Sequence, residues 1–148
     1  MIRPEHSILL IEDSPEDYQT TVRALRQVGL ANPIHHCADG DEALDFLHRR
    51  GAYADPARAP RPMIILLDLN LPGTDGREVL AEVKRCDGLK VIPVIVLTTS
   101  ADERDVQRCY EAGANSYIQK PVDFDGFLRA IRSLKEYWFE IVILPRGE

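Results

Sequence analysis

An unbroken run of apolar residues leads directly into an aspartate and then into turn-forming residues: Met63–Leu67, Asp68, Pro72, Gly73 and Gly76. A run of this length, bounded by a proline-rich segment before it and by turn residues after it, is typical of a strand covered on both faces, as in a parallel sheet. Ligands bind at the carboxyl ends of such strands. The stretch therefore predicts a buried strand that presents Asp68 at a ligand-binding edge, although this segment alone fits a helix-capping aspartate equally well.

Polar side chains also follow the other apolar segments that have the length of strands. These segments and the residues after them are Ser7–Ile11 with Glu12 and Asp13, Pro93–Leu97 with Thr98 and Thr99, and Asn115–Gln119 with Lys120 and Pro121. Pro33–Ala38 has a weaker pattern, which predicts a strand nearer the edge of the sheet. Amphipathic segments alternate with the strands and predict helices around Leu25, Leu44, Leu80, Val106 and Phe127.

Strands that alternate with helices in this way predict a doubly wound α/β sheet with right-handed crossovers. Because the carboxyl ends of the strands then lie at one edge, we expect five side chains to converge there: Glu12, Asp13, Asp68, Thr98 and Lys120. Carboxylates supply the oxygen ligands that Mg²⁺ prefers, and the ion would relieve their mutual repulsion. Asp68 is then a candidate nucleophile for phosphoryl transfer, with Lys120 and Thr98 contacting phosphoryl oxygens.

Composition excludes several classes of function. With 18 basic and 24 acidic residues the net charge is −6, and no basic stripe favours a nucleic-acid partner. No apolar run approaches the roughly 20 residues that span a bilayer, and the N-terminus lacks the apolar core of a signal peptide, so we expect a cytoplasmic protein without a membrane segment. Cys37, Cys86 and Cys109 lack metal-site or redox spacing, which predicts reduced packing residues.

With these residues in view, the chain resembles the receiver domains of two-component response regulators, of the single-domain, CheY-like type. The resemblance covers roughly residues 7–134. The motifs that carry it are Glu12 with Asp13, Asp68 within DLNLPGTDG, Thr98, and Lys120 with Pro121. It implies a flavodoxin-like (βα)5 fold with strand order 2-1-3-4-5 and a C-terminal extension, and a phosphorelay protein that accepts a phosphoryl group on Asp68 from a histidine kinase.

The resemblance also implies roles for residues around the acceptor. Mg²⁺, with Mn²⁺ or Ca²⁺ able to take its place, would be bound by Asp13, Asp68 and the backbone carbonyl of Asn70, and through water by Glu12. Tyr117 would be the switch aromatic that turns inward as the Thr98 hydroxyl moves to the phosphoryl group. Thr99 leaves the register of that hydroxyl open by one residue. The bond between Lys120 and Pro121 would be cis and would hold the amine in place.

Two other classes of function remain open. A Mg²⁺-dependent aspartyl-phosphate phosphatase or phosphotransferase acting on small molecules also uses a strand-end aspartate, but it usually carries a general acid two residues later, where this chain has Asn70. A docking module that is never phosphorylated would have no need to keep Glu12 beside Asp13. The receiver hypothesis predicts no enzyme activity beyond the chain's own phosphorylation and dephosphorylation.

The short segment after the predicted receiver suggests how the chain signals. Few residues follow Leu134, which predicts a stand-alone regulator that binds a downstream protein or passes its phosphoryl group to a phosphotransfer protein. Similar aromatic-rich tails that end in Leu-Pro, and a similar proline-rich loop after the second helix, occur in receivers that work with bacterial phytochrome kinases. The resemblance therefore extends to the phytochrome-associated group of response regulators.

The C-terminal segment carries more apolar residues than one receiver helix has to bury. We divide the chain into a receiver domain, residues 1–135, and an extension, residues 136–148, whose apolar side chains are Tyr137, Trp138, Phe139, Ile141, Val142, Ile143 and Leu144. A contiguous exposed patch of this kind is unusual for a monomer. We expect the extension to be an arm that forms a homodimer, with back-folding onto its own domain as the alternative.

Overall fold

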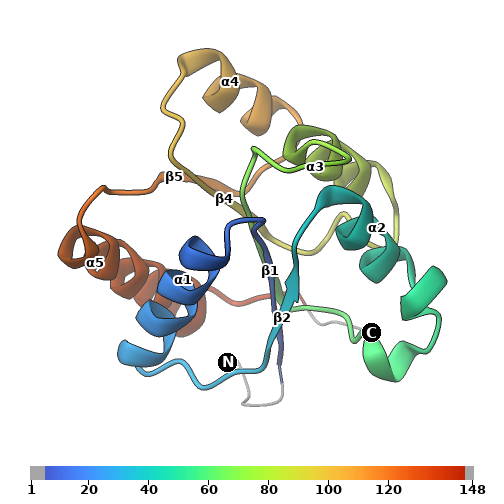
Figure 1. Cartoon of the computed structure of the whole chain (residues 1–148), viewed down its shortest axis with the longest axis horizontal. Helices are drawn as coiled ribbons and strands as arrows, with labels where there is room; N and C mark the ends of the chain where they lie inside the picture. Colours follow the sequence, from blue (N-terminus) through green and yellow to red (C-terminus); the bar gives the residue numbers. More distant parts are fainter. Residues whose placement is uncertain (1–5, 146–148) are drawn as a thin grey trace.

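A five-stranded parallel sheet forms the centre of the protein, with strand order β2-β1-β3-β4-β5 (Figure 1). The computed structural model describes residues 6–145. The strands are β1 (Ile8–Ile11), β2 (Ile34–Cys37), β3 (Ile64–Leu67), β4 (Val94–Thr98) and β5 (Ser116–Gln119). Every residue of β1, β3 and β4 is buried, whereas β2 and β5 lie at the edges and are mostly half-buried. The predicted doubly wound fold and its strand order are confirmed.

Helices cover both faces of the sheet (Figure 1). They are α1 (Pro15–Gln27), α2 (Gly40–His48), α3 (Gly76–Arg85), α4 (Glu103–Glu111) and α5 (Phe124–Leu134), with short 3-10 turns at Gly51–Tyr53 and Pro56–Arg58. Alternate residues of each strand face opposite sides, so Ile8 and Leu10 pack with α1 and α5, whereas Leu9 and Ile11 pack with α2, α3 and α4. No helix in the described residues is long and apolar enough to cross a bilayer.

Each of the five α-helices begins at a short polar residue that caps it. The side chain of this residue accepts a hydrogen bond from a backbone N–H in the first turn, and the caps are Ser14, Asp39, Asp75, Asp102 and Asp123. Such a cap stabilises a helix by about 0.5–2 kcal/mol relative to alanine. The caps therefore fix where each loop of the carboxyl edge ends, and so where the side chains in those loops can lie.

Two glycines hold the loop that follows β3 against its neighbours. A Cβ atom on Gly76 would lie 2.4 Å from the carbonyl oxygen of Asp68, and one on Gly40 would lie 1.7 Å from the carbonyl oxygen of Thr74. Both approaches are to backbone, so a side chain at either position would displace the loop. The start of α2 and the start of α3 thus clamp the segment that carries Asp68.

The C-terminal extension divides its side chains between the core and the surface. The chain continues from α5 into a π-helix, Lys135–Ile141, whose Phe139 is only 9% exposed and packs in the core beneath α1 and α5, with Trp138 partly buried beside it. The expectation that these side chains form a dimer arm rather than pack on their own domain is wrong for Phe139, because the helix continues and carries this ring back over its own domain. Residues 1–5 and 146–148, the outer ends of the two predicted segments, lie outside the described residues.

Candidate functional site

Three carboxylates meet at the carboxyl edge of the sheet. Glu12 and Asp13 directly follow β1, and Asp68 directly follows β3; the two strands are neighbours in the sheet. An oxygen atom from each of the three lies within 4.8 Å of the others, and we call this group the carboxylate cluster. Glu12 is buried, Asp68 is half-buried and Asp13 is exposed. The predicted convergence of the acidic residues is therefore confirmed.

Lys120, which follows β5, reaches the carboxylate cluster from the other side. Its Nζ lies 2.5 Å from Oε1 of Glu12, and the two side chains are 9% and 3% exposed. Burial raises the pKa of Glu12 to about 7, against the opposing hydrogen bond and charge of Lys120. Burial disfavours the charged amine, but the hydrogen bond and charge of Glu12 outweigh it and raise the pKa of Lys120. The short contact and the protonated amine favour the ionised pair.

The donor set of the carboxylate cluster fits a hard divalent cation. Lys120 contacts Glu12, but within residues 6–145 no lysine, arginine or histidine forms an ion pair with Asp13 or Asp68. Like charges held this close are disfavoured without a cation between them. Oxygen donors from several loops, one of them open to water, suit Mg²⁺, which keeps part of its own hydration. Asn70 lies exposed in the same loop as Asp68.

The hydroxyl groups after β4 have different environments. Thr98 is the last residue of β4 and is fully buried, and its Oγ1 accepts a long hydrogen bond, 3.5 Å, from the backbone N–H of Ser100. Thr99 is exposed and lines the cavity beside Lys120. The backbone N–H of Lys120 donates to the carbonyl oxygen of Thr98, which holds the two predicted residues on adjacent strands.

The loop after β4 is tied to three elements by polar contacts. The hydroxyl of Tyr117 donates to the carbonyl oxygen of Ser100 at 2.9 Å, and the hydroxyl of Ser100 donates to Asp105 of α4 at 3.0 Å. The guanidinium of Arg77 in α3 donates to both oxygens of Asp105, at 2.8 and 2.7 Å. Tyr117 thus contacts the loop that follows Thr98. Arg77 and Asp105 were not predicted as site residues, because neither belongs to a recognisable motif.

The expectation of a cis bond between Lys120 and Pro121 is wrong. The described residues contain no cis peptide bond, so this bond is trans. The trans form is the more stable isomer of an X–Pro bond by about 0.5–1 kcal/mol, and Lys120 reaches Glu12 from it without the cis geometry.

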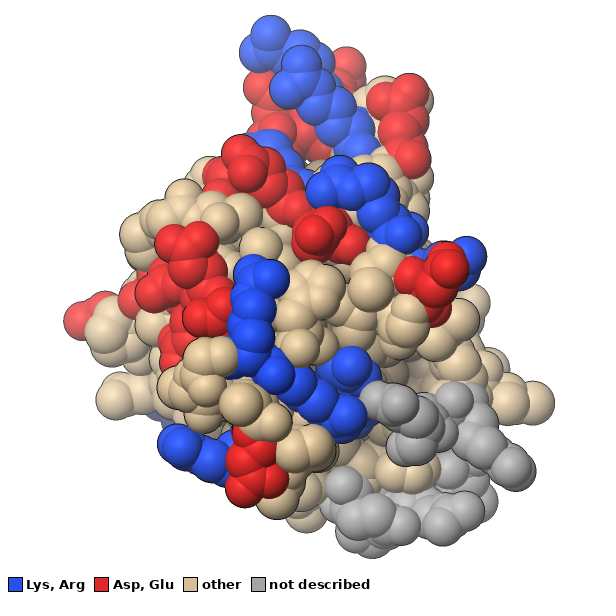
Figure 2. Space-filling model, turned by 90° about the vertical axis from the view of Figure 1, so that its right-hand side faces the viewer, with Lys and Arg blue, Asp and Glu red and all other residues tan. Residues whose placement is uncertain are grey.

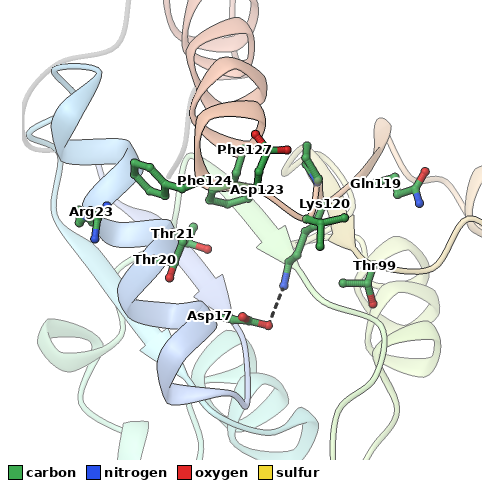
Figure 3. A pocket seen from close by; sticks show the side chains of 12 residues that line it. Asp17, Thr20, Thr21, Arg23, Thr99, Gln119, Lys120, Asp123, Phe124 and Phe127 are labelled. Carbon is green, nitrogen blue, oxygen red and sulfur yellow. Dashed lines mark ion pairs between the residues drawn. The ribbon is translucent and has the colours of Figure 1, made fainter.

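A cavity of about 620 Å³ opens beside Lys120, between α1 and α5 (Figure 3). Lys120 and Thr99 line it from the carboxyl edge, Asp17 and Arg23 from α1, and Phe124 from α5. The guanidinium of Arg23 lies 4.1 Å from the centre of the Phe124 ring. Asp17 was not predicted as a site residue either, because its one distinguishing feature in the sequence is its place in the first turn of the helix that follows Asp13.

Comparisons with known proteins agree with this geometry. A family model described as the response regulator receiver domain matches residues 8–132. Response regulator Rcp1 of Synechocystis sp. is 42% identical over 142 residues, which are 96% of this chain and 95% of that protein. The Mn(2+)-bound form of Rcp1 gives a TM-score of 0.87 at 41% identity, covering 95% of this chain and 99% of that one.

Two further solved structures are similar along nearly the whole chain. The phosphorylated cyanobacterial phytochrome response regulator RcpA has a TM-score of 0.89 at 39% identity and covers 96% of this chain and 99% of its own. The bacteriophytochrome response regulator AtBRR has a TM-score of 0.74 at 43% identity and covers 97% of this chain and 100% of its own.

Proposed function

Because the chain belongs to the response regulator receiver family, we propose that Asp68 accepts the phosphoryl group and that the carboxylate cluster holds the divalent metal ion that this reaction needs. The chain is a receiver similar to the phytochrome response regulators, and this similarity extends over nearly its whole length. The observation that carries the proposal is the meeting of three carboxylate oxygens within 4.8 Å, beside the amine of Lys120.

The residues of the site divide the work of phosphoryl transfer. Asp13, Asp68 and the carbonyl of Asn70 would hold Mg²⁺, with Glu12 acting through water; the ion supplies neutralisation of phosphoryl charge. A carboxylate oxygen of Asp68 forms the new O–P bond as the P–N bond of a phosphohistidine donor breaks, and the freed imidazole takes up a proton. Lys120 donates a hydrogen bond to a phosphoryl oxygen.

The hydroxyl of Thr98 and the ring of Tyr117 then respond to the phosphorylation of Asp68. Thr98 donates to another phosphoryl oxygen, and the loop after β4, held by the contact between Tyr117 and Ser100, adjusts with it. We assign the chain no catalysis beyond its own phosphorylation and dephosphorylation. Its role is signalling in the cytoplasm by contact with other proteins.

The donor is a sensor histidine kinase, and the phytochrome-associated kinases are the first class to test. A donor protein approaches Asp68 from the carboxyl edge, where the cavity between α1 and α5 offers apolar surface beside Lys120 (Figure 3). The output is a downstream protein or a phosphotransfer protein rather than nucleic acid. On the face that Figure 2 shows, basic side chains lie beside acidic ones, and the net charge of −6 does not favour a nucleic-acid backbone as the partner.

Phosphorylation with acetyl phosphate tests the acceptor. Wild-type protein should gain one phosphoryl group in the presence of Mg²⁺ and none after chelation, and Asp68→Asn should gain none while its circular dichroism stays unchanged. Asp125→Asn, which removes an exposed carboxylate from the first turn of α5, should be labelled as the wild type is. Labelling of Asp68→Asn at the wild-type rate would refute the assignment of the acceptor. A panel of histidine kinases, phytochrome kinases among them, then identifies the donor.

We also propose that the chain forms a homodimer through its C-terminal extension. Tyr137, Ile141 and Ile143 remain exposed, the last of them by 88%, while Val142 and Leu144 are half-buried. With Phe139 in the core, the surface offered to a partner is smaller than the sequence suggested. Two-fold association through identical patches is the commonest closure, and it would remove these side chains from water.

Light scattering at tens of micromolar tests the dimer. The wild type should have the mass of two chains, and the double variant Ile141→Ser with Ile143→Ser should have the mass of one. Val91→Ser, which removes an exposed apolar side chain from the loop before β4, should stay dimeric. A monomeric wild type would refute this proposal. Truncation after Lys135 is a poorer test, since it also deletes Phe139 from the core.

A further inference from the structure

The amine of Lys120 has a second carboxylate partner besides Glu12. Oδ2 of Asp17 lies 3.6 Å from Nζ of Lys120, an ion pair drawn as a dashed line in Figure 3. Asp17 belongs to the first turn of α1 and lines the cavity, and its side chain is 51% exposed. It is not a member of the carboxylate cluster and has no part in the metal site proposed above. Its charge therefore needs a separate explanation.

The position of Lys120 limits how far Asp17 can lie from the transferred group. An oxygen that accepts a hydrogen bond from Nζ lies about 3 Å from it. Since Asp17 is 3.6 Å from the same nitrogen, such a phosphoryl oxygen lies no more than about 6.6 Å from the carboxylate of Asp17. At this distance water and salt screen the repulsion between two negative charges only in part. The carboxylate of Asp17 therefore repels a donor that brings a negatively charged phosphoryl group to Asp68.

Asp17 also competes for the positive charge of Lys120. The ammonium group donates a hydrogen bond to Glu12 and forms an ion pair with Asp17 at 3.6 Å, so both carboxylates attract it before a phosphoryl group arrives. Lys120 can serve the phosphoryl oxygen fully only by weakening these contacts. Repulsion and competition have the same sign, because both raise the barrier for a small anion that enters the site alone.

We propose that Asp17 is a specificity-determining residue that slows phosphoryl transfer from small anionic donors. The proposal rests on Asp68 as the acceptor, and it concerns which donor is used rather than whether the site works. Asp17 would thereby slow phosphorylation of the chain by small metabolites such as acyl phosphates. Donors with less negative charge would be affected less.

The test compares two small donors on the full chain at saturating Mg²⁺. Acetyl phosphate carries more negative charge at neutral pH than phosphoramidate, whose nitrogen is protonated. Asp17→Asn should accelerate phosphorylation by acetyl phosphate about 3- to 10-fold at low ionic strength, and by phosphoramidate to a smaller extent. The gain should shrink towards one in 1 M salt, where the Debye length is about 3 Å. Asp17→Glu, which keeps the charge, should restore a slow rate.

Glu16→Gln is the matched control, because it removes one negative charge from the same first turn of α1. It should change the rate with acetyl phosphate less than twofold. A structural role of Asp17 in starting α1 would alter unfolding rather than the dependence on donor charge and salt. Equal rates for Asp17→Asn and the wild type, an equal gain in Glu16→Gln, or a gain that salt leaves unchanged would overturn the proposal. Absence of phosphorylation in the wild type would instead refute the proposed function.

Discussion

The carboxylate cluster and the C-terminal extension both contain side chains in unfavourable surroundings. In the cluster the cause is repulsion between like charges, and in the extension it is exposure of apolar side chains to water. At the cluster, Asp13 and Asp68 lie close together, and neither forms an ion pair with a described residue, although the charge of Lys120 acts on Asp68. In the extension, Ile141 and Ile143 stand in water. Two buried strands position the carboxylates, whereas the extension is anchored mainly by the buried ring of Phe139, with contacts of Trp138 and Lys135 beside it.

The two regions differ in how firmly the fold positions these side chains. The cluster directly follows β1 and β3, two strands whose residues are all buried, so the sheet fixes where its three residues begin. The extension contacts the domain through Phe139 and Trp138 and through Lys135, whose Nζ donates to the carbonyl oxygen of Val28 at the end of α1. The exposed side chains beyond Phe139 are therefore positioned by less of the fold than the carboxylates of the cluster are.

The largest effect should come from removing the anchor of the extension. Phe139→Ala should lower the free energy of unfolding by about 3–5 kcal/mol, because it leaves a cavity under α1 and α5. Urea unfolding followed by circular dichroism measures this. Tyr137→Ala, a change of similar size at an exposed position, should cost less than about 1 kcal/mol. Equal costs for the two variants would mean that the ring of Phe139 does not anchor the extension.

The fold and the acidic half of the site could be predicted from the sequence because local patterns determine them. The apolar runs that end at Ile11 and Leu67 specify buried parallel strands, and the residue after each strand must lie at the carboxyl edge. Convergence of Glu12, Asp13 and Asp68 follows from topology alone. No side-chain packing has to be known to reach that result.

The second effect concerns the metal. At a Mg²⁺ concentration ten times its Kd, the ion should stabilise the wild type by about 1.4 kcal/mol relative to chelated protein. Asp68→Asn should be more stable than the wild type without metal, because one of the repelling charges is gone, and should gain less from Mg²⁺. Thermal unfolding with Mg²⁺ and with chelator measures both quantities.

Phe139→Ala is the control that tests whether the C-terminal extension and the carboxylate cluster are energetically coupled. It should keep the full gain from Mg²⁺ while starting from a lower stability, since distant sites act independently. A reduced gain in this variant would mean that the extension and the carboxylate cluster are coupled, and the contrast between the two regions would not hold.

The third effect is a pH dependence that only the carboxyl edge should show. Hydrogen bonds from Arg77 lower the pKa of Asp105 from its usual value near 3.8 to about 2. Between these values the unfolded chain binds more protons than the folded one, so this stabilisation is present above about pH 4 and is lost as the pH falls through 2. With allowance for solvent screening it should amount to about 1 kcal/mol.

Urea unfolding between pH 2 and pH 7 tests this pH dependence. Asp105→Asn should flatten the fall in stability at the acidic end of the range, whereas the cost of Phe139→Ala should be the same at each pH because its surroundings are apolar. A fall in stability that is as steep in Asp105→Asn as in the wild type would assign the acid sensitivity to other carboxylates.

The features that the sequence could not predict depend on contacts between distant elements. The ion pair of Arg77 with Asp105 joins α3 to α4, and the contact of Asp17 with Lys120 joins α1 to the end of β5. Neither pair has a characteristic spacing. The burial of Phe139 depends on the direction in which the helix continues beyond α5, and a segment with seven apolar residues out of eight does not specify which of them the domain buries.

The smallest effect on the free energy of unfolding should come from the exposed side chains of the extension. At concentrations where the chain is monomeric, Ile141→Ser with Ile143→Ser should change the free energy of unfolding by less than about 0.5 kcal/mol per residue, because both side chains are already in water. At tens of micromolar the same variant should lose the additional stability that association gives the wild type, and its unfolding midpoint should no longer rise with protein concentration. A loss of more than about 1.5 kcal/mol in the monomer would place these side chains against their own domain and leave the dimer without its contact surface.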